Sequence, residues 1–109
     1  MMLDESKYLN LADAAFKHLE RAFADVDPDD VDFERAGDVV TILFRGGRRC
    51  IVNTQRPTRQ VWVAANARAW HFSYDEAEGL WYDDKDRSNE LFATIAAIVR
   101  ESSGVNVAI

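Results

Sequence analysis

Six carboxylate side chains lie within a stretch of ten residues in the first third of the chain. They are Asp25, Asp27, Asp29, Asp30, Asp32 and Glu34, and the first basic residue after them is Arg35. Carboxylates held this close repel one another, and a di- or trivalent cation relieves that repulsion. Because oxygen ligands alone select hard cations, the tract predicts a weak site for a metal of that class.

The same tract permits other interpretations. Its first positions are spaced like those of a calcium-binding EF-hand loop, but Asp30 and Ala36 stand where that loop needs glycine and glutamate, which excludes an EF-hand. A solvated acidic loop that leads into an edge strand, charged against aggregation, gives the same pattern. So does a surface that binds a basic protein.

No other combination of residues predicts a catalytic centre. His18 and His71 belong to different predicted elements and form no metal-binding pair. No serine, threonine or cysteine lies in a nucleophile motif beside a histidine, and Gly46-Gly47 is typical of a hairpin turn rather than a phosphate loop. The single Cys50 excludes an internal disulfide and a zinc site built on cysteines. We therefore expect a binding protein and not an enzyme.

Two amphipathic helices are predicted near the ends of the chain. Between residues 4 and 23, apolar side chains recur at steps of three and four, at Tyr8, Leu11, Ala12, Ala15, Phe16, Leu19 and Phe23. Pro28 stops any continuation of this helix. A second apolar stripe over residues 91–99 follows Ser88, which we expect to cap the helix with Glu90 in its first turn, and Gly104 is expected to end it.

Between the helices the apolar period changes to two, which predicts six strands. They cover residues 31–34, 39–44, 48–53, 60–65, 69–74 and 80–83, with a loop over 53–59. Short connections imply an antiparallel sheet, and two amphipathic helices imply that both pack on one face of it. The expected fold is a single α+β domain over residues 1–109, a two-layer sandwich of αβ₆α order.

Alternation sorts the strand residues between the two faces of this sheet. The face toward the helices is expected to receive Val40, Ile42, Phe44, Cys50, Val52, Val61 and Val63. The uncovered face is expected to receive Thr41, Leu43, Ile51, Asn53, Gln60, Trp62, Ala64 and His71. A tryptophan in this position is either an interface anchor on the open face or, if the register differs, a core aromatic.

Charge is segregated along the chain of 109 residues. Residues 1–40 carry 11 acidic and 4 basic side chains, residues 41–70 carry six arginines and no acid, and residues 71–109 carry 8 acids and 3 bases. Two faces of opposite potential would orient charged partners. The net charge of -6 argues against nucleic acid or an anionic membrane as the main partner. No apolar run approaches about 18 residues and no signal or transit peptide is evident, so we expect a cytoplasmic protein.

The centre of the chain resembles the signature of the frataxin family. The run from Asn53 to Trp62 reads Asn-x-Gln-x-Pro-x-x-Gln-Val-Trp, with Gln55, Pro57 and Gln60 at the fixed positions. Three further segments are similar to a bacterial member: Tyr8-x-x-Leu11-Ala12-Asp13, Trp70-His71-Phe72, and the acidic helix end and first strand up to Gly37. The resemblance covers about residues 4–102.

This resemblance implies a small α+β sandwich that binds iron weakly through an acidic ridge. It also implies docking on the cysteine desulfurase of iron–sulfur cluster assembly and on its scaffold protein, as iron donor or as regulator. The acidic ridge carries over onto Glu20, Asp25, Asp27, Asp29, Asp30, Asp32 and Glu34. The partner site on the sheet carries over onto Asn53, Gln55, Gln60 and Trp62. We expect a monomer, with an iron-induced oligomer as the alternative.

Departures from the family pattern indicate fewer or weaker metal sites. Ala24 replaces an acid common in close relatives, Lys17 and Arg21 dilute the helix side of the ridge, and Arg45 stands where relatives can carry glutamate. Two alternative functions are a ferroxidase or iron-detoxifying enzyme and a regulatory scaffold without a metal role. A di-iron oxidase needs Glu-x-x-His pairs on buried helices, and Ala15 stands three residues before His18. Any iron oxidation is therefore expected to be incidental.

Overall fold

Helix α1 (Glu5–Phe23) forms from the first apolar stripe, in a computed structural model that describes residues 3–109. Asp4 caps its N-terminus, because the Asp4 carboxylate accepts a hydrogen bond of 2.9 Å from the backbone N–H of Lys7. The buried residues of the helix all belong to the predicted stripe: Tyr8, Ala12, Ala15, Phe16, Leu19 and Phe23.

Helix α2 (Leu91–Ser103) begins at a different cap from the one predicted. Glu90, not Ser88, is the N-cap, and its carboxylate accepts hydrogen bonds from two backbone N–H groups of the first turn. Ser88 instead donates its hydroxyl and its backbone N–H to the Asp86 carboxylate. Gly104 ends the helix with a φ of 78°, as predicted. Neither helix in residues 3–109 is long and apolar enough to cross a membrane.

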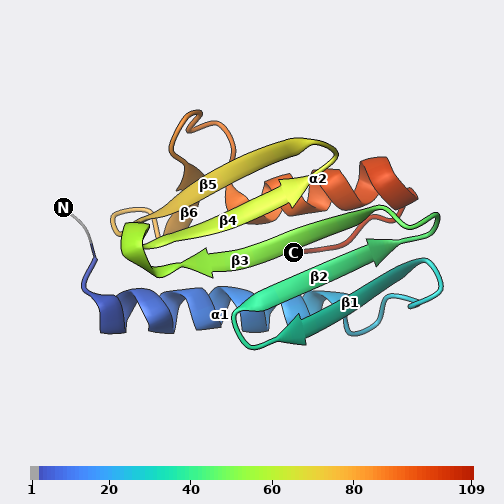
Figure 1. Ribbon diagram of the computed structural model, residues 1–109, viewed down its shortest axis with the longest axis horizontal. Helices are drawn as coiled ribbons and strands as arrows, with labels where there is room; N and C mark the ends of the chain where they lie inside the picture. The colour runs from blue at the N-terminus through green and yellow to red at the C-terminus, as the bar shows by residue number, and fades with distance from the viewer. Residues whose placement is uncertain (1–2) are drawn as a thin grey trace.

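Six antiparallel strands form one sheet in the order of the sequence (Figure 1). They are β1 (Val31–Ala36), β2 (Val39–Phe44), β3 (Arg49–Gln55), β4 (Gln60–Ala65), β5 (Arg68–Asp75) and β6 (Leu80–Asp83). A 3₁₀ helix, η1 (Arg56–Thr58), forms within the predicted loop, whose first three residues belong to β3. Strands β1 and β3 run two residues further than predicted, because the ladder pairs Ala36 with Val39 and Gln55 with Gln60.

Both helices pack on one face of the sheet, behind it in the view of Figure 1. The strand residues predicted to face them are all buried: Val40, Ile42, Phe44, Cys50, Val52, Val61 and Val63. They form one core with residues of the two helices, among them Tyr8, Phe16, Leu19, Leu91, Ile95 and Val99. Burial raises the pKa of the Cys50 thiol to about 12, which leaves it protonated at neutral pH. The predicted two-layer sandwich of αβ₆α order is confirmed.

The Tyr8 hydroxyl ties α1 to the segment that carries the central motif. It donates a hydrogen bond of 2.6 Å to the Gln60 carbonyl and accepts one of 3.1 Å from the Gln55 backbone N–H. Burial raises the pKa of this phenol, so it stays protonated and keeps both bonds. Tyr8 therefore fixes the two ends of η1, between the strands that present the predicted partner site.

The turn between β4 and β5 carries backbone strain that one substitution relieves. Asn66 and Ala67 both have positive φ, 53° and 61°, as a two-residue type I′ turn requires. Asparagine and glycine adopt this conformation readily, whereas a residue such as alanine pays roughly 1–2 kcal/mol. We expect Ala67→Gly to raise the free energy of unfolding by about 0.5–1 kcal/mol.

Denaturant unfolding measures this effect, and Ala64 provides the matched control. Ala64 is also exposed, but it lies within β4 and has no positive φ. Ala64→Gly is expected to lower the free energy of unfolding by about 0.5–1 kcal/mol. If both variants lost stability equally, the turn would not be strained at Ala67.

Candidate metal-binding and partner-binding surface

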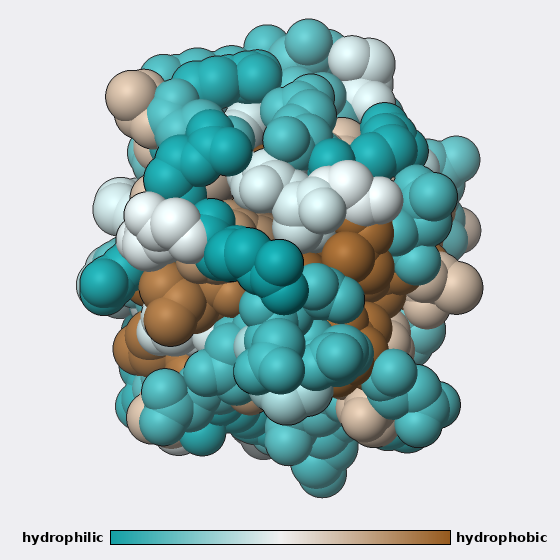
Figure 2. Space-filling model, turned by 90° about the vertical axis from the view of Figure 1, so that its right-hand side faces the viewer, coloured by the Kyte–Doolittle hydropathy of each residue, from teal (hydrophilic) through white to brown (hydrophobic). Residues whose placement is uncertain are grey.

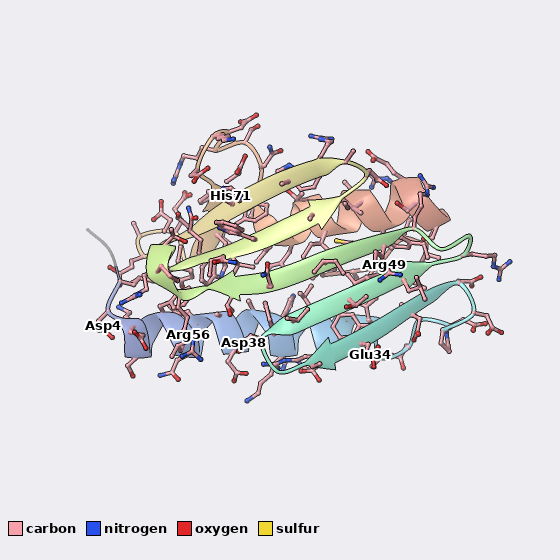
Figure 3. All side chains as sticks on the ribbon, in the orientation of Figure 1. Asp4, Glu34, Asp38, Arg49, Arg56 and His71 are labelled. Atoms are coloured by element: carbon pink, nitrogen blue, oxygen red, sulfur yellow. The ribbon has the colours of Figure 1, made fainter. Side chains whose placement is uncertain are left out.

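The sheet face opposite the helices is uncovered and carries the predicted partner residues. Asn53, Trp62 and His71 are direct neighbours in the register of β3, β4 and β5. They form a row across this face, which is the side turned to the viewer in Figure 3, where His71 is labelled. A parallel row contains Glu34, Thr41, Ile51 and Ala64. The centre of the face therefore carries Ile51, Trp62 and His71 beside the polar Asn53 and Thr41, and its β1 edge is acidic.

Trp62 points away from the core but is only half-exposed. Val61 and Val63 on either side of it are buried, in agreement with the predicted alternation. The indole stacks on the His71 ring with centroids 4.1 Å apart and planes 19° from parallel. Its Nε1–H donates a hydrogen bond of 2.9 Å to Gln60 Oε1. The partial burial of Trp62 thus comes from neighbours on the same face.

Gln60 is only 8% exposed, so its side chain offers little surface to a partner. Its Nε2 donates hydrogen bonds of 3.1 Å to Ser73 Oγ and 3.0 Å to Asp84 Oδ2, while Oε1 accepts from the Trp62 indole. Sequence reasoning missed both Ser73 and Asp84. Alternation along β5 could have found Ser73, two positions after His71, whereas Asp84 lies beyond the end of β6.

The remaining two predicted partner residues are accessible in part. Asn53 lies beside Trp62 on the open face and is half-buried. Gln55 is also half-buried and pairs with Gln60 at the start of the β3–β4 connection. Together with Trp62 and Gln60, they make one continuous surface along neighbouring strands.

The acidic ridge follows one edge of the molecule. Glu20 lies on α1, Asp32 and Glu34 lie on the edge strand β1, and the loop between these elements carries Asp25, Asp27, Asp29 and Asp30. All of these residues are exposed except Asp30, which is half-buried. Figure 2 shows the end of the molecule where this loop lies, and its surface is mainly hydrophilic. Charges along an edge strand also oppose strand-to-strand aggregation.

The ridge carboxylates do not converge on one point. Within residues 3–109, no three side chains of histidine, cysteine, aspartate or glutamate come close enough together to hold a metal ion. The loop is held by its own hydrogen bonds: Asp27 Oδ1 accepts one of 2.9 Å from the Asp29 N–H, and the Asp27 carbonyl accepts one of 2.9 Å from the Asp30 N–H. Exposed carboxylates of this kind fit a hard cation that keeps much of its water and exchanges readily.

Arg35 neutralises the helix side of the ridge. Its guanidinium donates hydrogen bonds of 2.8 Å to Glu20 Oε1 and 2.7 Å to Asp13 Oδ1. This guanidinium, with a smaller effect from Lys17, holds the pKa of the Asp13 carboxyl below its usual range. Because the Arg35 side chain is largely buried beside Phe16, this end of the ridge is fixed in place.

Arg45 neutralises the loop side of the ridge from the end of β2. Its guanidinium donates to Asp30 Oδ1 at 3.0 Å and to the Asp29 carbonyl at 3.3 Å. Within the described part of the chain, five ridge carboxylates remain without an ion pair: Asp25, Asp27, Asp29, Asp32 and Glu34. These five are the carboxylates most available to a cation or to a basic partner.

The charge blocks of the sequence do not stay separate in space. Three arginines of the basic block pair with acids of the first block: Arg45 with Asp30, Arg56 with Asp38, and Arg59 with Glu5. The last two pairs are loose, with nitrogen–oxygen distances of 3.7 Å. These contacts reduce the predicted opposition between a basic and an acidic face.

Comparison with known proteins agrees with the fold and with the motif. The chain matches the frataxin-like domain over residues 1–105. It is 45% identical over 105 residues to the iron-sulfur cluster assembly protein CyaY of Pseudomonas aeruginosa, covering 96% of this chain and 95% of that protein. The protein of the same name from Paraburkholderia phymatum is 34% identical over 107 residues, or 98% of each chain.

A solved structure gives the same result at the level of the fold. The frataxin of Psychromonas ingrahamii, described as a model to study stability modulation within the CyaY protein family, superposes with a TM-score of 0.87. The two chains are 28% identical, and the match covers 96% of each. With a family match over nearly its whole length and relatives above 30% identity, this chain belongs to the frataxin family.

Proposed function

We propose that this protein is an iron-binding accessory protein of iron–sulfur cluster assembly. In this proposal it docks on the cysteine desulfurase and its scaffold protein, and it acts there as iron donor or as regulator rather than as an enzyme. The observation that carries the proposal is the junction of an acidic ridge with an uncovered, aromatic sheet face in one small domain. Relatives of the same family are named iron-sulfur cluster assembly proteins.

The acidic ridge supports docking on a basic protein surface. Its unpaired carboxylates lie along one edge, where they attract a positively charged partner and raise the rate of encounter. Asp32 and Glu34 belong both to this edge and to the open face, because they alternate along β1 with Val31 and Phe33. A partner that meets the ridge is thereby brought over the sheet.

The open face supports a more specific contact. Binding energy at protein interfaces concentrates in a few residues, of which tryptophan is among the commonest. Trp62 is already ordered by its stack on His71 and its hydrogen bond to Gln60. Beyond Asn53 in the same row of the sheet lies the apolar side chain of Val39, which is 39% exposed. These features suit a surface that a partner covers.

A reconstituted assembly reaction tests this function. Purified cysteine desulfurase, scaffold protein, cysteine and ferrous iron form a cluster on the scaffold, which visible absorbance follows in time. Adding this protein is expected to raise the initial rate at limiting iron if it donates iron, and to lower the rate if it restrains the desulfurase. An unchanged rate at both limiting and saturating iron would contradict the proposal.

Ferrous iron is expected to bind weakly and at the ridge. By comparison with open carboxylate sites, the dissociation constant should lie on the order of 10⁻⁶ to 10⁻³ M, and other hard cations should compete. Amide resonances followed during a titration should change first in the loop that contains Asp25 and Asp27. Changes centred on His18 or Cys50, with the resonances of the ridge residues unchanged, would contradict this prediction.

Two double variants test whether the ridge itself binds the iron. Asp25→Asn with Asp27→Asn removes two unpaired ridge carboxylates and is expected to weaken iron binding. Glu76→Gln with Glu78→Gln removes the same charge from the turn between β5 and β6 and is expected to leave the titration unchanged. Equal weakening by both pairs would mean that net charge, and not the ridge, attracts the cation.

A further inference from the structure

A closed set of contacts joins the end of β6 to the aromatic pair on the open face. The Asp84 carboxylate accepts a hydrogen bond from Gln60 Nε2 at 3.0 Å, and Gln60 Oε1 accepts one from the Trp62 indole at 2.9 Å. Trp62 stacks on His71, and the His71 carbonyl accepts a hydrogen bond of 2.9 Å from the Asp84 backbone N–H. Asp84 is therefore connected to both members of the aromatic pair. Its carboxylate is connected to Trp62 through Gln60, and its backbone N–H bonds to the His71 carbonyl.

Donor and acceptor types leave the Gln60 amide a single orientation. An indole N–H can only donate and an ionised carboxylate can only accept. Gln60 must therefore turn its Oε1 to Trp62 and its Nε2 to Asp84. A flipped amide would face its NH₂ against the indole N–H and its oxygen against the carboxylate. Because Gln60 is 8% exposed, little water is available to replace either bond.

Asp83, the residue before Asp84, is also connected to the aromatic pair, through the backbone of His71. Asp83 is 8% exposed, and its Oδ1 accepts a hydrogen bond of 3.1 Å from the His71 backbone N–H. The backbone of His71 is thus bonded through both its N–H and its carbonyl to the Asp83-Asp84 pair. The ring on which the indole rests is therefore attached to the same short segment that orients Gln60.

We propose that Asp84 is a positioning residue for Trp62, acting through the Gln60 amide to hold the indole in the orientation that a partner meets. Gln60 then works as a relay within the surface and not as the direct contact that the sequence predicts. An indole that is ordered before the partner arrives loses less conformational freedom on binding. The effect on affinity rests on the proposed function, whereas the order of the indole is a property of the free protein.

The free protein gives the first test. In Asp84→Ala, the Trp62 indole N–H is expected to shift in the NMR spectrum and to exchange with solvent about fivefold faster, the factor for losing one net hydrogen bond. The other two indoles, of Trp70 and Trp81, are buried and serve as internal references. Asp84→Asn is expected to restore the wild-type signal, because its amide oxygen also accepts from Gln60 Nε2.

A matched control separates this contact from a general effect on the loop. Asp86 lies two residues further on, is also exposed, and bonds to Ser88 rather than to Gln60. Asp86→Ala is expected to leave the Trp62 indole signal unchanged. The positioning role is overturned if Asp84→Ala leaves the indole shift and exchange rate at their wild-type values, or if Asp86→Ala changes them equally.

Binding to purified cysteine desulfurase and scaffold protein gives the second test. Asp84→Ala is expected to lower the affinity about fivefold, with Asp84→Asn close to wild type. A direct charge contact between Asp84 and the partner would instead weaken Asp84→Asn as much as Asp84→Ala, which would overturn the positioning role. If the wild-type protein did not bind at all, the proposed function would fail, and the indole measurement would still decide the role of Asp84.

Discussion

Trp62→Ala is expected to lower the affinity for the complex of cysteine desulfurase and scaffold protein by about 30-fold or more, with the fold intact. This factor corresponds to the roughly 2 kcal/mol that defines a dominant interface residue. A fully buried tryptophan cut to alanine costs about 3–5 kcal/mol of stability. Trp62 lies outside the core, where it stacks on His71 and donates one hydrogen bond to Gln60, so the expected loss is below about 1.5 kcal/mol.

Thermal unfolding beside a binding assay measures both effects of this substitution. Trp81 is the contrasting control, because it is 3% exposed and packs edge-on against Tyr8 and Tyr74. Trp81→Ala is expected to destabilise the protein by about 3–5 kcal/mol. A Trp62→Ala protein that is unfolded at room temperature would contradict the assignment of Trp62 to the open face and would indicate that its side chain is part of the core.

Reversing the charge of the ridge is expected to have an effect of similar size on binding. With Asp25, Asp27, Asp30 and Asp32 changed to lysine, the affinity for the desulfurase should fall on the order of 100-fold at low salt, and by roughly tenfold with asparagine. Most of the loss should appear in the association rate, because these exposed charges steer encounter. The difference should shrink at high salt, where exposed charges are screened within about 8 Å or less.

Four acids away from the ridge provide the matched control for this reversal. They are Glu76, Glu78, Asp86 and Glu101, all of them exposed. Changing these four residues to lysine alters the net charge by the same amount. The ridge prediction requires this control to bind nearly as well as wild type. An equal loss of affinity in the control would assign the effect to net charge.

The fold could be predicted from periodicity, because the face of a strand or helix on which a side chain lies is set by its position relative to its neighbours in the sequence. Val61 and Val63 face the helices and Trp62 does not, as strict alternation requires. The cap of α2 shows the limit of such local rules. Serine is a better N-cap than glutamate in general, but Ser88 bonds to Asp86, and a bridge between Tyr82 and Glu90 keeps the chain extended up to Glu90. Helix α2 therefore starts later than the local sequence predicts.

The contacts that shape the site depend on residues far apart in the sequence. Gln60 lies on the expected face, yet its amide is held by hydrogen bonds to Ser73 and to Asp84, which is 24 residues away. Arg45 reaches the acidic loop because β2 ends where that loop enters β1, so that it bonds to Asp30, 15 residues earlier. No periodic pattern encodes either contact. Composition and spacing gave the kinds of residues at the site but not their pairing.

Direct binding of the wild-type protein to purified cysteine desulfurase tests the central claim, that the acidic ridge and the open sheet face form one docking surface. Calorimetric titrations at low and at high ionic strength measure it, and a repeat with ferrous iron shows whether metal and partner can occupy the ridge together. The account predicts saturable binding whose affinity falls as ionic strength rises. No saturable binding, or the same affinity at both ionic strengths, would contradict it.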